Sequence, residues 1–416
     1  MSKNIAIIGG GIIGLCSAYY LIKDGHKVTI IDKSSLDSGA SYINAGYLCP
    51  GHIIPLAAPG IIKQGIRWMF DSSSPLYIEP RINMEFFKWM YAFYKSCTDK
   101  HVINSIPGIL NLSLLSQDLL QEIKDENNFK FHYEKKGLLM LCKTEKAMLH
   151  EEHTVKLAIE NGLVAKMINK SEIKQLEPDV EIDSIGGAYF KCDHHSTPGE
   201  FMSVLKEFLL RKGVRIFKNT LIDNFVLEGE KIKKIFFDGQ HMEFDEYVFA
   251  AGPWTNYLCN KIGVKLLLQA GKGYAMNVCE ETKINLPAIL VESKCAITPM
   301  NGFTRFSGTM EIASINNNNI RRNRVDAIAN SACSYYPNLK INEDVRSKAA
   351  FGLRAISADG LPYIGRSTKI KNIVIATGHN MTGWSMSTGT GKLVSDFISE
   401  KTPSIDTSFY NPERKF

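Results

Sequence analysis

The chain has 416 residues, 44% of them hydrophobic and 22% charged, a composition typical of a folded globular protein rather than a disordered or fibrous one. Its net charge of +6 is spread along the sequence without a block of like charges, so nucleic acid is not an expected partner. Nine cysteines without a C-x-x-C pair argue against a disulfide framework and favour a reducing, cytoplasmic location.

The first uncharged stretch, residues 4–22, is long enough on length alone for a membrane span. Four glycines interrupt it, however, at positions where a turn between a strand and a helix requires them. We therefore predict a βαβ unit, with a strand at 4–8, a helix that ends before Gly25 and a second strand at 28–31.

The glycines match the pattern G-x-G-x-x-G, with Gly9, Gly11 and Gly14 at its three glycine positions. Such a turn lets the backbone approach a pyrophosphate, which the N-terminus of the following helix attracts. Asp32 ends the second strand, where a carboxylate accepts hydrogen bonds from the adenosine ribose and disfavours the 2′-phosphate of NADP. The pattern predicts a dinucleotide site and leaves NAD and FAD both open.

A second α/β region begins near Thr197, where an N-cap, Pro198 and a capping-box Glu200 predict a helix that runs to Gly213. Further strands are expected at 214–217, 247–251 and 373–376, followed by a glycine-rich connection at 377–390 and a last helix at 392–399. Residues 263–344 are expected to be rich in β-structure.

These segments predict an α/β fold with two discontinuous domains. The nucleotide-binding domain would comprise residues 1–50, 195–262 and 345–416. A second domain, a mixed-sheet α+β unit for the substrate, would comprise residues 51–194 and 263–344.

Three further segments carry a resemblance to a known family. They read SYINAGYLCPG at 41–51, GLRAISADGLPYIG at 352–365 and ATGHNMTGWSMSTGTGK at 376–392. With the glycine pattern, they resemble the FAD-dependent D-amino-acid oxidase superfamily, and within it most closely the small subunits of bacterial D-amino-acid dehydrogenases. The resemblance is collinear over nearly the whole chain. It implies a glutathione-reductase type of FAD domain and a non-covalently bound FAD.

The resemblance also implies which residues hold the FAD. The pyrophosphate would meet the backbone amides of Ile12 and Ile13, and Asp32 with Lys33 would flank the adenosine ribose. The other positions that the resemblance assigns to the cofactor are Ser41, Ala45, Gly46, Ile222, Gly252, His379, Met381, Thr382, Gly383, Trp384 and Ser385.

Arg354, in the G-L-R segment, stands where the family holds the substrate carboxylate, and a guanidinium fork suits that planar anion. Arg81, Arg305 and Arg346 are weaker candidates for this role. His52 stands where the related dehydrogenases often have Tyr, and we predict that it lines the substrate pocket, with a polar loop histidine as the alternative.

Two positions depart from the related glycine oxidases. Met381 replaces an Arg and Ala296 replaces a Tyr of those relatives, so neither contact is expected here. The histidines 194 and 195, and 150 with 153, come without a third ligand at a recognisable spacing. Hydride transfer to a flavin needs no metal, and we predict none.

The implied reaction is the FAD-dependent oxidation of a small D-amino acid by hydride transfer from Cα to flavin N5, followed by hydrolysis to a 2-oxo acid and ammonia. A D-hydroxyproline dehydrogenase, a glycine or sarcosine oxidase, and a flavin-binding subunit without turnover remain alternatives. The sequence does not distinguish a quinone, the respiratory chain or oxygen as electron acceptor. The aromatic run at 86–91 is expected to pack between domains, with a peripheral contact at the inner face of the cell membrane as the alternative.

Overall fold

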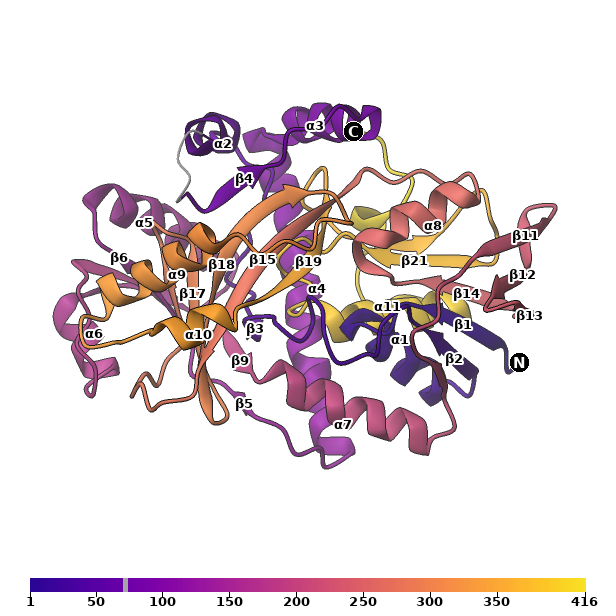
Figure 1. Cartoon of the computed structure of the whole chain (residues 1–416), viewed down its shortest axis with the longest axis horizontal. Helices are drawn as coiled ribbons and strands as arrows, with labels where there is room; N and C mark the ends of the chain where they lie inside the picture. The colour runs from indigo at the N-terminus through magenta and orange to yellow at the C-terminus, as the bar shows by residue number, and fades with distance from the viewer. Residues whose placement is uncertain (70–73) are drawn as a thin grey trace.

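The computed structural model describes residues 1–69 and 74–416. A six-stranded sheet has the order β10-β2-β1-β14-β21-β20 (Figure 1). The strand β20 is antiparallel to β21, and the other pairs are parallel. The strands are β1 (Asn4–Ile8), β2 (Lys27–Ile31), β10 (Arg215–Phe217), β14 (Glu246–Phe249), β20 (Tyr363–Arg366) and β21 (Ile373–Thr377).

Both faces of this sheet are buried, as the alternating side chains of β1 illustrate. Ile5 and Ile7 belong to a core shared with the helices on one face, whereas Ala6 and Ile8 belong to the core on the other face. Strands covered on both sides read as continuous apolar runs, which is why the sequence predicts them well. The predicted βαβ unit at the N-terminus is confirmed.

Helices α1 (Ile12–Lys23) and α7 (Pro198–Arg211) lie on one side of the sheet and α8 (Thr255–Lys261) lies on the other (Figure 1). Helix α11 (Ser387–Ser399) packs on α1, and a three-stranded sheet of β11 (Asn224–Glu228), β12 (Lys231–Phe237) and β13 (Gln240–Met242) completes the core on the side of α8.

The last helix begins five residues earlier than its glycine content predicts, at Ser387 instead of residue 392. Gly389 and Gly391 lie inside it at close contacts: an added Cβ would come within 2.7 Å of Ser116 Oγ and 2.5 Å of the Cys16 backbone, respectively. Close packing of α11 against α4 and α1 therefore outweighs the low helix propensity of these glycines.

The predicted capping box of α7 is absent. Thr197 is the N-cap and Pro198 lies in the first turn, but the Thr197 side chain accepts no hydrogen bond from a helix amide. Its Oγ1 instead accepts a hydrogen bond from the Asn301 amide at 3.0 Å, and Glu200 accepts bonds from His132 N and Asn301 Nδ2. The two polar side chains thus join α7 to neighbouring segments rather than to its own N-terminus.

The second large sheet has nine strands and is mostly antiparallel, in the order β19-β15-β18-β17-β16-β6-β8-β7, with β4 paired to β18. Its strands are β4 (Leu76–Ile78), β6 (Leu138–Cys142), β7 (Ala165–Asn169), β8 (Gly186–Phe190), β15 (Leu268–Val278), β16 (Ala288–Leu290), β17 (Cys295–Met300), β18 (Phe303–Ala313) and β19 (Ala350–Ser357).

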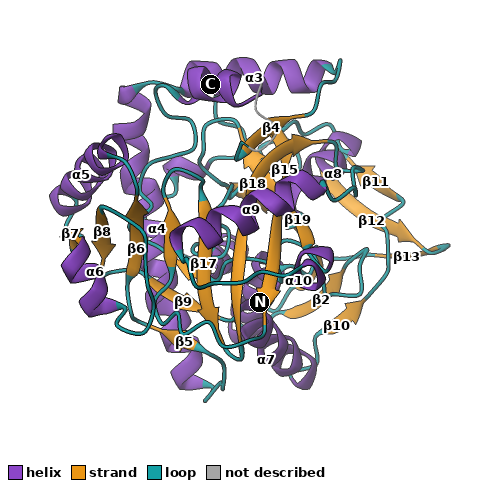
Figure 2. Ribbon diagram, turned by 60° about the vertical axis from the view of Figure 1, so that its left-hand side comes forward, coloured by secondary structure: helices purple, strands orange, loops and turns teal. Residues whose placement is uncertain are grey.

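Helices also pack on this sheet, and Figure 2 shows α9 lying across one of its faces. They are α5 (Glu145–Glu160), α6 (Lys170–Leu176), α9 (Arg322–Tyr335) and α10 (Glu343–Ser347). The prediction that 263–344 is rich in β-structure is confirmed up to residue 313 but is wrong beyond it, where α9 and α10 pack over the preceding strands.

A small sheet has the order β3 (Tyr47–Leu48), β9 (His194–Ser196), β5 (Tyr133–Glu134), and its strand β3 contacts the long helix α4 (Asp99–Glu126). Helix α4 packs on α11, although it belongs to the segment 51–194 that we assigned to the substrate domain. The domain boundaries stay a prediction.

Helices α2 (Ile61–Met69) and α3 (Met84–Ser96) lie at the top of Figure 1 near the C-terminus. On α3, Phe86 and Trp89 are buried against β18 and β19, as the packing interpretation of the aromatic run requires, whereas Phe87 and Tyr91 are exposed. Among the described residues, no helix has both the length and the apolar character to cross a membrane.

Candidate active site

A cavity of about 1900 Å³ lies where the carboxyl ends of β1 and β2 meet the strands β15, β18 and β19 of the large sheet. Ligand pockets typically have volumes of roughly 300–1,000 Å³, so this one has room for a dinucleotide and a second small molecule. In doubly wound α/β sheets, ligands bind outside the carboxyl ends of the strands, as the cavity would require.

The glycine loop between β1 and α1 is shaped by close backbone contacts. Gly9 has a φ of +111°, and an added Cβ would overlap the carbonyl of Ala250, while a Cβ on Gly14 would overlap the carbonyl of Gly9. Gly11 is the N-cap and has no side chain to satisfy the first amides of α1. Ile12 N donates to Ser41 Oγ at 3.1 Å, and the helix terminus otherwise offers amides and a positive dipole end to an anion.

Asp32 supports this loop from the end of β2. Its Oδ2 accepts a hydrogen bond from Gly10 N at 2.6 Å, and its Oδ1 accepts one from Ser34 N at 2.7 Å. Oδ1 also accepts from Ser34 Oγ at 2.7 Å, whereas Oδ2 has a second lone pair with which it can accept from a ribose hydroxyl. The next residue, Lys33, lies over the indole ring of Trp254, with Nζ 3.4 Å from the ring centroid.

The loop that follows β21 is pinned by hydrogen bonds to distant segments. His379 Nε2 lies 2.9 Å from Thr390 Oγ1, and burial lowers the pKa of its imidazole to about 3, so the ring is neutral at physiological pH. Trp384 Nε1 donates to Ser196 Oγ at 3.0 Å. Ser385 Oγ accepts a bond from Cys49 N at 2.6 Å. The loop is therefore held rigidly against β3 and β9.

The structure brings nearly all the predicted cofactor residues to the lining of this one cavity: Gly9, Gly11, Ile12, Ile13, Asp32, Lys33, Ser41, Ala45, Ile222, Gly252, His379, Met381, Thr382, Gly383, Trp384 and Ser385. Gly14 and Gly46 are not part of that lining. Both allow close backbone approach instead, and Gly46 has a φ of +77° beside the carbonyl of Ser196. The individual cofactor contacts remain predictions.

Arg354 projects from β19 into the same cavity. Its Nη1 donates to the carbonyl of Thr309 at 3.0 Å, and burial lowers the pKa of the guanidinium to about 10, which leaves it cationic at neutral pH. Among the residues that the structure describes, no carboxylate lies within 4.0 Å of it. A buried cation without an ionic partner favours an anionic ligand.

The three rival arginines have other partners. Arg81 donates to Gln269 Oε1, and Arg346 lies 3.1 Å from the carboxylate of Asp326. Arg305 is buried and donates from Nη1 to the carbonyls of Tyr42 at 2.8 Å and Asn44 at 2.7 Å. Arg305 thus holds the segment that leads to Ala45, a role that the sequence does not reveal.

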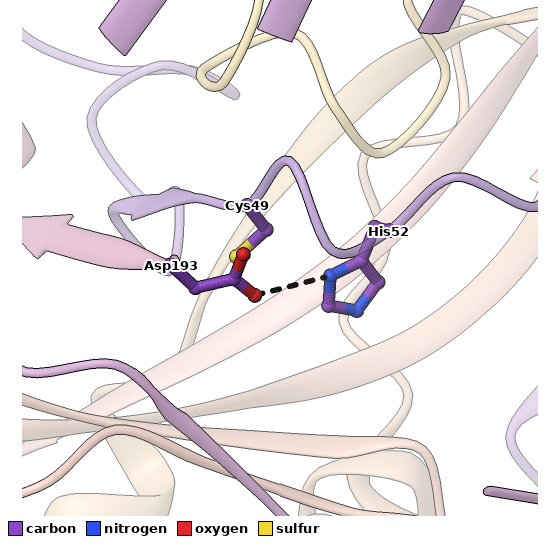
Figure 3. A group of neighbouring side chains, drawn as sticks. All are labelled: Cys49, His52 and Asp193. Atoms are coloured by element: carbon purple, nitrogen blue, oxygen red, sulfur yellow. Dashed lines mark ion pairs between the residues drawn. The ribbon is translucent and has the colours of Figure 1, made fainter. Parts of the chain in front are cut away.

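His52 also lines the cavity, and Figure 3 shows it beside Cys49 and Asp193. Donor atoms of the three side chains lie within 4.8 Å of one another. Asp193 is fully buried, which raises its pKa to about 7, whereas burial lowers the pKa of His52 to about 4. Three donors fall short of the four ligands of a closed structural zinc site, and we assign no metal to the cluster.

Sequence reasoning missed further polar groups of the cavity wall. Glu151 of α5 is only 2% exposed, and burial raises its pKa to about 7; among residues 1–69 and 74–416, its Oε2 has no hydrogen-bond partner. Lys294 and His150 lie in the same wall, as do Ala296 and Met381, the two positions that depart from glycine oxidases. No short motif marks Glu151 or Lys294, because each reaches the cavity through tertiary packing.

The fold and the site together define a class of protein with a dinucleotide-type glycine loop at one end of a large cavity that a buried arginine also lines. A family model described as FAD dependent oxidoreductase matches residues 4–397. The chain therefore belongs to the FAD dependent oxidoreductase (DAO) family, and FAD is its cofactor. The glycine loop, the uncapped terminus of α1 and Asp32 fit the pyrophosphate and ribose of that cofactor.

Individual relatives agree with this assignment. The chain is 29% identical over 411 residues to the D-amino acid dehydrogenase of Granulibacter bethesdensis, with 97% of each chain covered. Its structure is similar to glycine oxidase from Geobacillus kaustophilus, with a TM-score of 0.78, 20% identity and coverage of 100% and 99%. It is also similar to L-proline dehydrogenase from P. horikoshii, with a TM-score of 0.75, 19% identity and coverage of 99% and 97%.

Proposed function

We propose that this protein catalyses the FAD-dependent oxidative deamination of a small D-amino acid, with Arg354 as the group that binds the substrate carboxylate. The observation that carries the proposal is the buried Arg354 guanidinium, which has no ionic partner among the described residues and lines the cavity that also contains the dinucleotide site. A D-amino acid dehydrogenase among the relatives supports the substrate class.

The bound FAD would supply a two-electron acceptor for the hydride of the substrate Cα. The chain supplies binding and orientation. A guanidinium presents two parallel N–H donors to a carboxylate, and the bond from Arg354 Nη1 to Thr309 O restrains the orientation of that fork. A carboxylate fixed at one end sets the direction of the Cα–H bond, which is the main contribution that orientation makes to such a reaction.

The wall around Arg354 is apolar. Met310 Sδ lies 4.0 Å from Nη1, and Ile312 lines the cavity further along β18. Side chains of this kind exclude water and strengthen the attraction between the guanidinium and an anion. The part of the wall at Met310 and Ile312 therefore suits an uncharged substrate side chain.

The electron acceptor and the location complete the proposal. We propose a cytoplasmic protein with a peripheral contact at the inner face of the cell membrane, where a quinone or another component of the respiratory chain could accept the electrons, as could oxygen. The exposed apolar side chains of α3, Met84, Phe87, Tyr91 and Tyr94, together with the exposed Lys88, support this contact. Sedimentation with anionic lipid vesicles tests it, and loss of binding in Phe87→Ser with Tyr91→Ser is expected.

Anaerobic bleaching of the bound flavin tests the reaction itself. The holoenzyme should lose its visible absorbance with small D-amino acids in a panel that also contains L-amino acids, glycine, sarcosine and D-hydroxyproline. Preference for D-hydroxyproline would identify the narrower dehydrogenase, and preference for glycine or sarcosine the corresponding oxidase. A flavin that no member of the panel reduces would contradict the proposal and favour a flavin-binding subunit without turnover.

A further inference from the structure

His52 and Asp193 face each other across a short gap beside the cavity (Figure 3). Asp193 Oδ1 accepts a hydrogen bond from Gly51 N at 2.9 Å, while its Oδ2 lies 4.0 Å from His52 Nδ1. Within the described part of the chain, neither Oδ2 nor Nδ1 has a hydrogen-bond partner, although both atoms are buried. A small rotation of either side chain would make them partners of each other.

The two ring nitrogens of His52 lie in different surroundings. Nδ1 is buried beside Asp193, yet the side chain as a whole is 36% exposed, so its exposed atoms lie on the rest of the ring. Figure 3 shows the second nitrogen, Nε2, on the side of the ring away from Asp193. Because His52 lines the cavity, this free edge is available to a bound molecule.

The segment after His52 leads back toward Arg354. Leu56, four residues later, packs in the same hydrophobic cluster as Met310 and Ile356. Met310 contacts the Arg354 guanidinium. His52 and Arg354 thus line the same cavity, and this hydrophobic cluster connects the segment after His52 with the residues around Arg354.

We propose that His52 accepts the proton that the α-ammonium group of the substrate loses before oxidation, and that Asp193 is the residue that positions it. The inference rests on the proposed function. An α-ammonium group has no lone pair to stabilise the developing positive charge at Cα when hydride leaves. In the step, one N–H bond of the ammonium breaks and one N–H bond forms at His52 Nε2. The substrate nitrogen becomes neutral and the imidazole becomes a cation beside the Asp193 carboxylate.

The role of Asp193 follows from the tautomers of imidazole. An ionised Asp193 accepts a hydrogen bond from Nδ1–H, which leaves the lone pair on Nε2 free to take a proton. A protonated Asp193 donates to Nδ1 instead, and Nε2 then carries a hydrogen and cannot act as a base. The pair is therefore active only when the carboxyl is ionised.

Burial raises the pKa of Asp193 to about 7, so the active form should appear as the pH rises through about 7. The other titratable groups near the pair are Cys49 and Cys192, which contact Asp193, and Lys294, whose charge disfavours protonation of His52. Glu151 and His150 share the cavity wall, and burial also raises the pKa of Glu151 to about 7. Glu151 must therefore be tested separately.

The rate of anaerobic flavin bleaching by the best amino acid, measured against pH, tests the pair. The wild-type rate should rise with an apparent pKa near 7. His52→Ala should be slower by about 100-fold or more, the usual contribution of a positioned base. Millimolar imidazole should restore part of that rate, because the truncated side chain leaves space in the cavity. In Asp193→Asn, the amide mimics the protonated acid, so the rate should be low. The rise of the rate near pH 7, which we call the limb of the pH–rate profile, should disappear.

Binding of propionate, a carboxylate without an amine, provides the second readout through its effect on the visible spectrum of the flavin. Its Kd should be unchanged in His52→Ala and Asp193→Asn, since Arg354 remains intact. Asp193→Asn also keeps an oxygen acceptor for Gly51 N, so the loop should fold. In the control Glu151→Gln, the limb near pH 7 should persist.

A wild-type limb in Asp193→Asn, a wild-type rate in His52→Ala, or a loss of propionate binding that matches the loss of rate would each overturn the proton-transfer role. Those results leave the proposed amino-acid oxidation intact, provided that the wild-type flavin bleaches. A wild-type flavin that no amino acid bleaches would instead defeat the proposed function, and this step with it.

Discussion

The Arg354 side chain extends from β19 over Gly273 of the paired strand β15, where an added Cβ would come within 2.5 Å of Cζ of the guanidinium. The absence of a side chain at Gly273 therefore makes the room that Arg354 occupies. Gly273→Ala should displace the guanidinium and lower kcat/KM by about 10- to 100-fold, because misplacement by about 1 Å is enough for such losses.

Steady-state kinetics and the flavin content of the purified variant check this prediction. The FAD should be retained, because the glycine loop and Asp32 lie in other segments. Gly199→Ala is the matched control, since the nearest atom to an added Cβ there is 4.0 Å away, on Tyr42. Equal kcat/KM for Gly273→Ala and wild type would show that Arg354 does not act from its observed position.

Asp32→Ala should weaken FAD binding by about 1.5–3 kcal/mol, the range for hydrogen bonds to a charged group. The carboxylate accepts from the Gly10 amide and from the amide and hydroxyl of Ser34, and Oδ2 has a lone pair left for the ribose. Titration of the apoprotein with FAD measures the effect. Asp37→Ala, at an exposed carboxylate five residues further along, should bind FAD normally. The same affinity in both variants would remove Asp32 from the site.

Much of the fold could be predicted because local signals agree with tertiary structure. The strands β1, β2 and β21 are apolar runs in a sheet buried on both faces, and the glycines before α1 mark the turn. The predicted start of α11 was wrong because Gly389 and Gly391 lie in close contact with neighbouring helices, and helix propensity takes no account of such contacts. The predicted capping box does not form because Glu200 accepts hydrogen bonds from His132 and Asn301, which are distant in sequence.

Some residues of the candidate site could likewise be predicted from the sequence, and others could not. Arg354 and the glycine loop belong to contiguous motifs, and both reach the cavity as predicted. The partnership of His52 with Asp193 joins residues far apart in sequence, through the pairing of β3 with β9. Glu151 and Arg305 carry no motif, and their burial depends on how α5 and β18 pack. Single-sequence reasoning has no access to such contacts.

Glu151 should destabilise the fold as the pH rises from about 4.5 to about 7. Between these values the carboxyl ionises in the unfolded chain but stays protonated in the folded one, since burial raises its folded pKa to about 7. The cost reaches about 3 kcal/mol above pH 7 and vanishes below about pH 4.5. Glu151→Gln should therefore raise Tm relative to wild type at pH 8 but much less at pH 5. A Tm difference that does not change with pH would contradict the assignment.

The enantiomers of a substrate should differ strongly. With the carboxylate held by Arg354, exchange of two groups at Cα turns the C–H bond away from the direction in which hydride must leave. D-alanine should therefore reduce the flavin much faster than L-alanine under anaerobic conditions. Comparable rates would rule out a fixed carboxylate as the source of orientation. Weak rates for both, with fast reduction by sarcosine or D-hydroxyproline, would favour the narrower alternatives.

The comparison of Arg354→Lys and Arg354→Ala with wild type tests the central claim most directly. Lysine keeps the charge but not the two parallel hydrogen bonds, so kcat/KM for the best D-amino acid should fall by about 10- to 100-fold, and further in the alanine variant. If the carboxylate contact also orients Cα, kcat itself should fall at saturating substrate. The flavin should remain bound with a near-normal visible spectrum. Wild-type kcat/KM in Arg354→Ala, or outright loss of its flavin, would contradict the account.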